Sequence, residues 1–154
     1  MEEKEYRDTY QTINERRCVF EKTINSRRCT CRQSQRFHLA DREGIACKSA
    51  TGNALCTTLL SSMRSNARFA LHLTSADGPL PHAKEIKVQT GGLLGLQGLI
   101  RPEHAENSVV ENALGLIDAA FEKYGSGDAL PFDIIVQASV KFEGRRKRPR
   151  RGDS

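Results

Sequence analysis

The chain has 154 residues, a length that suits one domain able to bury a core without disulfides. Hydrophobic residues make up 38% of it, which predicts a modest core and a polar, loosely packed part. The formal charge is +5, but six of the 24 basic residues lie between 145 and 151, and the chain without residues 145–154 is neutral. This distribution argues against a folded domain that binds nucleic acid over a broadly basic surface.

The ends of the chain bear on its location. No apolar run reaches the roughly 18 residues of a membrane-spanning helix. The first residues, MEEKEYRDTY, are charged, unlike the apolar core of a signal peptide or the Arg-rich, acid-poor pattern of a transit peptide. We therefore expect a cytoplasmic protein. Thiols stay reduced there, and clustered cysteines indicate metal or redox chemistry.

Three regions differ in composition. Residues 1–50 form a polar, Cys-rich segment that we expect to bind a metal. Residues 51–143 carry the regular hydrophobic periodicity of an α+β core. Residues 144–154 form a basic tail that we expect to be disordered.

The five cysteines are the strongest chemical signal, and they lie at Cys18, Cys29, Cys31, Cys47 and Cys56. Their odd number rules out a complete set of internal disulfides. Residues 18–31 are predicted to form a β-hairpin that would place Cys18 opposite Cys31, with Cys29 on the same face. Cys47 or Cys56 would supply a fourth sulfur. Four thiolates suit Zn²⁺ or an iron–sulfur cluster.

The spacing of the cysteines favours an iron–sulfur cluster over zinc. Zinc ribbons bring paired CxxC knuckles, which are absent from this sequence, whereas the ligands of iron–sulfur clusters are often irregularly spaced. Arginines at 17, 27, 28 and 32 flank the cysteines and would offset the charge of a thiolate-bound cluster or lower thiol pKa values. Three alternatives stay open: His38 as a substitute ligand, Cys56 as a core residue, and a metal-free redox switch.

The middle of the chain predicts a helix and two strands. Residues 53–64 are expected to be helical, with Cys56, Leu59, Leu60 and Met63 on one face. Residues 68–73 and 85–89 alternate as strands do, with turn residues at Asp77, Gly78, Pro79 and Pro81 between them. Segment 91–98 is rich in glycine but lacks the Lys-Ser/Thr of a phosphate-binding loop. We interpret its glycines as allowing a turn, a bulge or close backbone packing.

The last part of the core predicts a helix and a strand. Ser108 and Glu111 fit a capping box, and Gly125 ends the helix that follows. Residues 132–142 alternate in the pattern of a half-buried strand. The whole order predicts an α+β fold, with a small antiparallel sheet and helices packed on one face. Unpaired sheet edges would suit a homodimer.

Two functions are compatible with these features. The favoured one is a small soluble metal-centre protein that acts in electron transfer or sensing, with a protein redox partner, or as a subunit of a larger complex. The alternative is an RNA- or DNA-binding module that contacts phosphates or an acidic partner through Arg145, Arg146, Lys147, Arg148, Arg150 and Arg151. No nucleophile–base constellation is visible in the sequence, so we do not expect an enzyme by itself.

Overall fold

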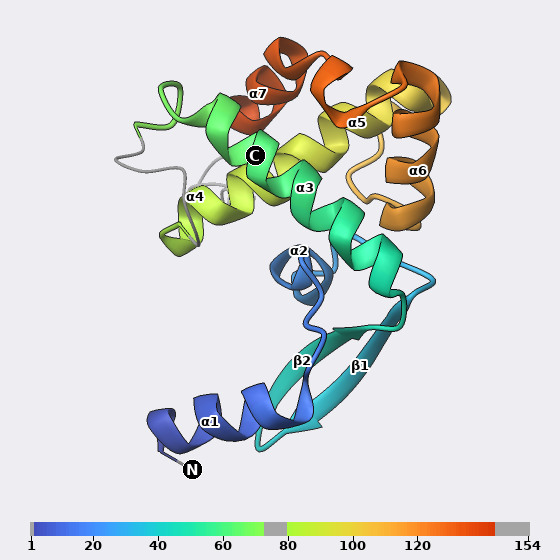
Figure 1. The fold of residues 1–154 in the computed structure, drawn as a ribbon. Coiled ribbons are helices and arrows are strands. Elements are labelled where there is room, and N and C mark those ends of the chain that lie inside the picture. Colours follow the sequence, from blue (N-terminus) through green and yellow to red (C-terminus); the bar gives the residue numbers. More distant parts are fainter. Residues whose placement is uncertain (1, 73–79, 144–154) are drawn as a thin grey trace, which may run out of the picture.

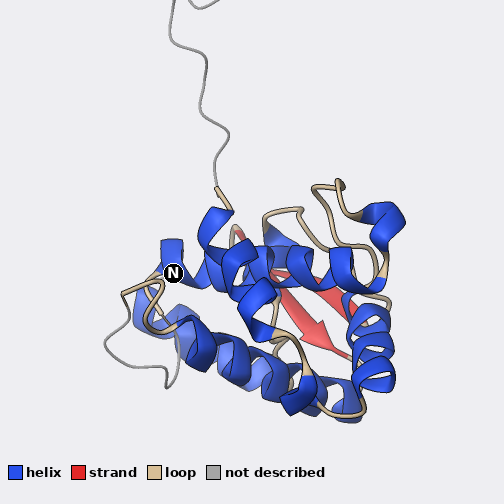
Figure 2. Ribbon diagram, turned by 90° about the horizontal axis from the view of Figure 1, so that it is seen from above, coloured by secondary structure: helices blue, strands red, loops and turns tan. Residues whose placement is uncertain are grey.

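The computed structural model describes residues 2–72 and 80–143, and its fold is α+β with helices predominating (Figure 2). This confirms the predicted fold class. None of the helices in the described ranges is long and apolar enough to cross a membrane. The elements in chain order are α1 (Glu3–Ile13), α2 (Glu21–Asn25), β1 (Ser34–Leu39), β2 (Arg42–Cys47), α3 (Ala50–Ala67), α4 (His82–Ile86), the π-helix η1 (Lys87–Gly91), α5 (Gly92–Ile100), the short 3₁₀ helix η2 (Pro102–His104), α6 (Ala113–Tyr124), a second 3₁₀ helix η3 (Gly127–Ala129) and α7 (Phe132–Lys141).

In the described part of the chain, the strands form one antiparallel hairpin, which lies with α1 at one end of the molecule (Figure 1). Ser34 faces Cys47 and Leu39 faces Arg42, so two residues form the turn. The hairpin predicted over residues 18–31 is wrong. Phe20 and Ile24 lie one helical turn apart and are both buried, and the segment forms α2 instead.

The two predicted helices are present. The N-cap Ser49 starts α3 by accepting a hydrogen bond from the Gly52 N–H at 2.9 Å. Gly125 ends α6 in the left-handed conformation with φ of 82°. The capping box of Ser108 and Glu111 does not form, because α6 begins only at Ala113 and the residues before it pair with the N-terminal segment.

The three predicted core strands are wrong. Residues 132–141 form α7, in which Ile135 and Ser139, four residues apart, are buried. Residues 85–89 are helical across α4 and η1 because their buried positions also recur at helical spacing. Residues 69–72 form turns in which the Phe69 side chain is 86% exposed. Asp77, Gly78 and Pro79, expected to form a turn, lie outside the described residues.

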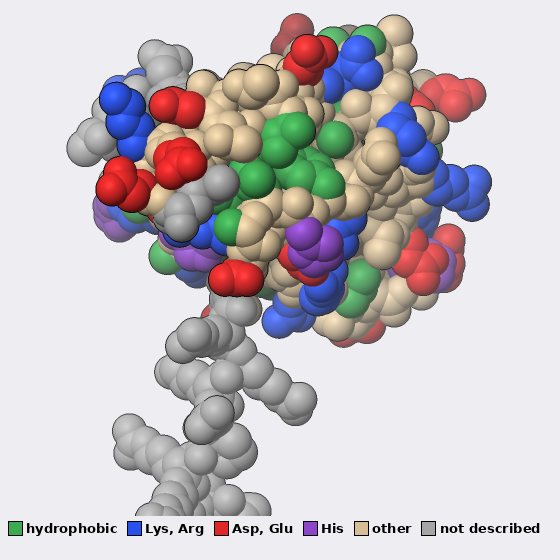
Figure 3. Space-filling model, turned by 90° about the horizontal axis from the view of Figure 1, so that it is seen from below, with side chains coloured by type: hydrophobic (Ala, Val, Ile, Leu, Met, Phe, Trp, Pro, Cys, Tyr) green, Lys and Arg blue, Asp and Glu red, His purple; other side chains and the backbone are tan. Residues whose placement is uncertain are grey.

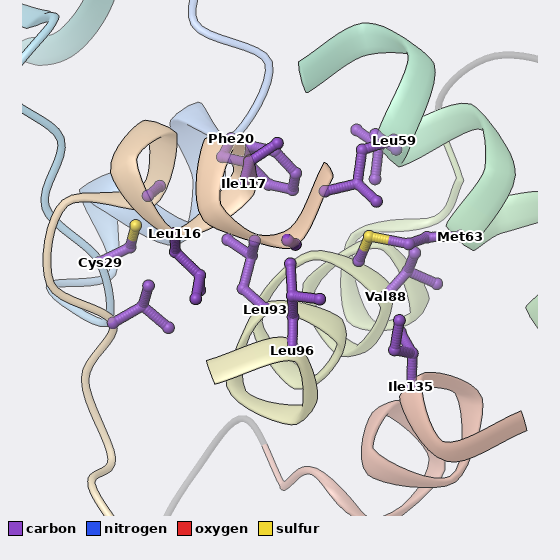
Figure 4. Packing of buried hydrophobic residues seen from close by; sticks show 14 of the residues in the cluster. Phe20, Cys29, Leu59, Met63, Val88, Leu93, Leu96, Leu116, Ile117 and Ile135 are labelled. Carbon is purple, nitrogen blue, oxygen red and sulfur yellow. The ribbon is translucent and has the colours of Figure 1, made fainter. Parts of the chain in front are cut away.

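One hydrophobic cluster holds the helices together, and part of it is drawn in Figure 4. Leu59 and Met63 of α3 face Val88, Leu93 and Ile135 across this cluster. The N-terminal segment contributes to the same cluster through Phe20, Ile24, Cys29 and Ile45. The Cys-rich segment is therefore packed onto the helices by apolar burial.

Glycines let η1 and α5 approach α7 closely. A Cβ atom on Gly91 would lie 2.7 Å from the Ser139 Cα and 2.9 Å from the Ala138 carbonyl oxygen. A Cβ atom on Gly95 would lie 2.7 Å from the Ala138 Cβ. The structure thus bears out close backbone packing among the interpretations of the Gly-rich segment, and it places these glycines inside helices.

The described surface carries charges of both signs. On the face drawn in Figure 3, basic and acidic side chains are interspersed around a patch of hydrophobic side chains. This mixture agrees with a chain that is neutral outside residues 145–154.

The glycine packing gives a matched pair of substitutions. Gly91→Ala forces a Cβ against backbone atoms, and we expect it to lower the free energy of unfolding by about 1–3 kcal/mol. Gly98→Ala places its Cβ at an ordinary 3.8 Å from the Ala105 Cβ, so it should be neutral or stabilising by up to about 1 kcal/mol. Urea unfolding of both variants measures the difference, and equal stabilities would contradict the close approach of η1 to α7.

Candidate metal centre

Four of the five cysteines line one pocket: Cys18, Cys31, Cys47 and Cys56. They come from the turn before α2, the loop before β1, the end of β2 and the second turn of α3. The rest of the lining is mostly apolar and includes Val19, Phe20, Ile24, Ala113 and Leu114. Segments up to 38 residues apart in sequence thus bring their sulfurs to one place.

Backbone hydrogen bonds position two of these cysteines. The Cys18 N–H donates to the Ile45 carbonyl at 2.9 Å, and the Cys47 N–H donates to the Arg16 carbonyl at 2.8 Å. Residues 16–18 therefore run beside the end of β2, although they are not a regular strand. This backbone pairing sets Cys18 near Cys47.

The β1–β2 hairpin and α3 position the other two cysteines of the pocket, Cys31 and Cys56. Ser34 lies opposite Cys47 in the sheet, and its hydroxyl donates to the Cys31 carbonyl at 2.7 Å, which fixes the loop that carries Cys31. Only two residues separate β2 from α3, so the direction of β2 also sets the place of Cys56. Gly52 packs against Leu114, holding the first turn of α3 against α6.

Cys29 has a different environment. It is 3% exposed, its Sγ donates to the Thr30 carbonyl at 3.3 Å, and it lies beside Leu116 in the core (Figure 4). Residue 29 also forms an isolated β-bridge with Val110. His38 is exposed on β1 and does not line the cysteine pocket.

The thiols of the pocket favour the protonated state. The pKa of Cys18 is raised to about 12, mainly by burial and in smaller part by the neighbouring Cys31 and Cys47, which would repel a thiolate. Burial likewise raises the pKa of Cys56 to about 12. A hydrogen bond from the Phe20 backbone to Cys18 acts in the opposite direction, but burial is the larger effect. Since the thiolate is the nucleophile in disulfide exchange, these pKa values disfavour a metal-free redox switch at Cys18 or Cys56.

The four sulfurs share the pocket without meeting at a point. Across residues 2–72 and 80–143, no three His, Cys, Asp or Glu side chains are grouped so as to hold a metal ion. A single tetrahedral zinc would need sulfurs about 3.8 Å apart, given a Zn–S distance near 2.3 Å.

The arginines that flank the cysteines are partly committed elsewhere. Arg17 donates to the Glu21 carboxylate at 2.8 Å, and Arg27 pairs with Glu43 at 3.2 Å. Arg32 is exposed. Carboxylates therefore already compensate two of the four arginines that we expected to offset the charge of a cluster.

Two carboxylates that sequence patterns did not predict are buried. Glu21 is 7% exposed and Glu85 is 1% exposed, and both are paired with arginines. Arg17 and Glu21 stand four apart, the spacing of an ordinary surface pair on a helix, so their burial had no local signal. Glu85 pairs with Arg64, 21 residues away, and short-range patterns do not reveal such a pair.

The basic tail cannot be placed in this arrangement, because its six basic residues lie outside the described residues. Its binding of nucleic acid or of an acidic partner stays a prediction. No family model matches the chain, and no curated protein and no solved structure was found to be similar to it. The function must therefore be argued from the cysteine pocket itself.

The raised thiol pKa values predict slow alkylation. In reduced, metal-free protein at about pH 8, Cys18 and Cys56 should react with iodoacetamide at least ~100-fold more slowly than in the unfolded chain. The rate should rise about tenfold per pH unit, because the thiolate fraction grows until the pH reaches the pKa near 12. Peptide mass spectrometry measures labelling at each cysteine. Equal rates in folded and unfolded protein would contradict the burial of these thiols.

Proposed function

We propose that the chain holds a metal centre on Cys18, Cys31, Cys47 and Cys56, and that the centre is an iron–sulfur cluster. The observation that carries this proposal is the convergence of four cysteines from four separate segments on one pocket. Cysteines that served only as small core residues would have no reason to gather there. Cys29, which packs in the core, is an example of that ordinary role.

The irregular spacing of the cysteines along the chain, without paired CxxC knuckles, supports a cluster over a single zinc ion. A cluster is larger than one ion, so its ligands stand further apart than the roughly 3.8 Å between sulfurs around zinc. Zinc, held by the same four cysteines, is the second candidate.

The surroundings of the pocket suit a redox centre. Its lining is mainly apolar, and burial and hydrogen bonding around the sulfurs are what tune the potential of a cluster. All four cysteines are only partly buried, so the centre would lie near the surface, where a protein partner can exchange electrons with it. We therefore propose one-electron transfer or cluster-dependent sensing as the role, in the reducing cytoplasm.

Loading the centre would displace protons. Each thiol must ionise to bind metal, and the raised pKa values of Cys18 and Cys56 make this step depend steeply on pH. The metal's own charge offsets the repulsion that keeps the empty set protonated. Affinity for metal should therefore fall as the pH is lowered.

Two neighbouring cysteines provide a matched test of the ligand set. Cys31→Ala should lose the cluster, seen as loss of brown colour, iron and acid-labile sulfide after anaerobic purification, because it removes one of four ligands. Cys29→Ala should keep the cluster and only lose some stability through a core cavity. Visible absorption spectra and metal analysis of both variants make the comparison.

The same experiment decides among the alternatives. If the wild-type protein contains stoichiometric zinc and no iron, the centre is a zinc site and the iron–sulfur assignment is wrong. Neither metal in the anaerobically purified protein would refute the proposal. A cluster that depends on Cys29 and not on Cys31 would show that the pocket is the wrong set of ligands.

A further inference from the structure

A second, larger cavity adjoins the cysteine pocket. Its volume is about 410 Å³, within the roughly 300–1,000 Å³ typical of small-molecule sites. The turn that carries Cys18, the N-terminal end of α2, α3 and the helical stretch of α4 and η1 form its walls. Cys18 and Val19 line both the cavity and the cysteine pocket, so the two are immediate neighbours.

The ionised groups of the cavity leave one positive charge without a carboxylate. Arg17 donates two hydrogen bonds to Glu21, at 3.0 and 2.8 Å. Arg64 pairs in the same way with the buried Glu85. The third cation, Lys22, contacts only the His82 Nδ1, at 3.3 Å, among the residues that the structure describes.

A buried amide adds a hydrogen-bond donor. Gln89 of η1 lines the cavity although its side chain is only 3% exposed. Its Oε1 accepts a hydrogen bond from the Thr23 hydroxyl at 3.2 Å. Its amide nitrogen donates no hydrogen bond to another described residue, so it can donate to a ligand. The π-helical turn that carries Gln89 is of a kind often found at functional sites.

The rest of the wall is apolar and selects the body of the ligand. Val19 and Leu60 line the cavity from two different segments, the turn before α2 and the middle of α3. A ligand that matches both the unpaired positive charge and the apolar wall of the cavity therefore carries one negative charge and a short apolar chain. A phosphate, with a charge of about −1.5 to −2, would exceed the single unmatched cation.

We propose that this cavity binds a small monocarboxylic acid, with its carboxylate toward Lys22 and Gln89 and its chain against Val19 and Leu60. The site goes beyond the metal centre and does not depend on which metal the cysteines hold. A bound acid would lie against Cys18, and its occupancy would change the solvation of the sulfur at the edge of the centre.

Butyrate and its neutral isostere butyramide test the charge requirement. In saturation-transfer NMR titrations of the full chain, butyrate should bind saturably and about tenfold more tightly than butyramide, the scale of one hydrogen bond to a charged group. Inorganic phosphate should compete weakly. Absence of saturable butyrate binding, or equal binding of butyrate and butyramide, would overturn the proposal.

A pair of lysine variants locates the site. Lys22→Gln should weaken butyrate binding about tenfold and leave butyramide binding unchanged, because it removes only the unmatched charge. Lys123→Gln, an exposed residue on α6 that does not line the cavity, should bind butyrate as the wild-type chain does. Butyrate binding by Lys22→Gln that is as tight as in the wild-type chain would refute the site. Iron and sulfide content, measured on the same samples, reports separately on the metal centre.

Discussion

The buried carboxylate of Glu21 is the interaction on which the N-terminal half depends. It accepts hydrogen bonds from the Tyr10 hydroxyl, from the Arg17 guanidinium and from the Ile45 N–H at 2.8 Å. These partners belong to α1, to the turn before α2 and to β2. A buried charge is costly unless it is paired and hydrogen-bonded, and removing one partner of such a pair typically costs about 3–5 kcal/mol. Glu21 therefore fixes α1, the turn before α2 and β2 relative to one another. The position of Cys18 is set as a result, because Cys18 lies in that turn.

This scaffold explains how a polar segment presents four sulfurs without using them as its support. The turn that Glu21 holds runs beside the end of β2, and the backbone bonds of Cys18 and Cys47 lie there. Phe20 and Ile24 then carry the segment onto the helical core. The framework of the pocket is thus built from backbone pairing, one buried carboxylate and apolar burial. A metal would not have to organise the chain, but the sulfurs would have to move together around it, because no three of the described side chains are grouped to hold an ion.

Local patterns predicted helices better than strands, for a physical reason. Helices α3 and α6 have strong start or stop signals at Ser49 and Gly125. Residues 132–142 have apolar side chains at every second position and also at 134–136, so they satisfy a period of two and a helical stripe alike. Tertiary packing against Gly91 and Gly95 decides for the helix, at the cost of leaving Ile134 exposed. The true strands show no clear alternation, because β1 is polar and half exposed and the buried residues of β2, Gly44 and Ile45, are adjacent.

The candidate site shows the same division between local and distant information. The clustering of cysteines in the first 56 residues is visible in the sequence, but the choice between Cys29 and Cys31 is not. Residue 29 bridges Val110, 81 residues away, and this contact draws its side chain into the core while Cys31 lines the pocket. The neighbouring cavity follows from equally distant contacts, since its walls come from α2, α3 and η1. Cys18 lines both the pocket and the cavity. A metal bound in the pocket and a ligand bound in the cavity would therefore both act on the Cys18 sulfur, and this coupling between the two sites requires no movement of the fold.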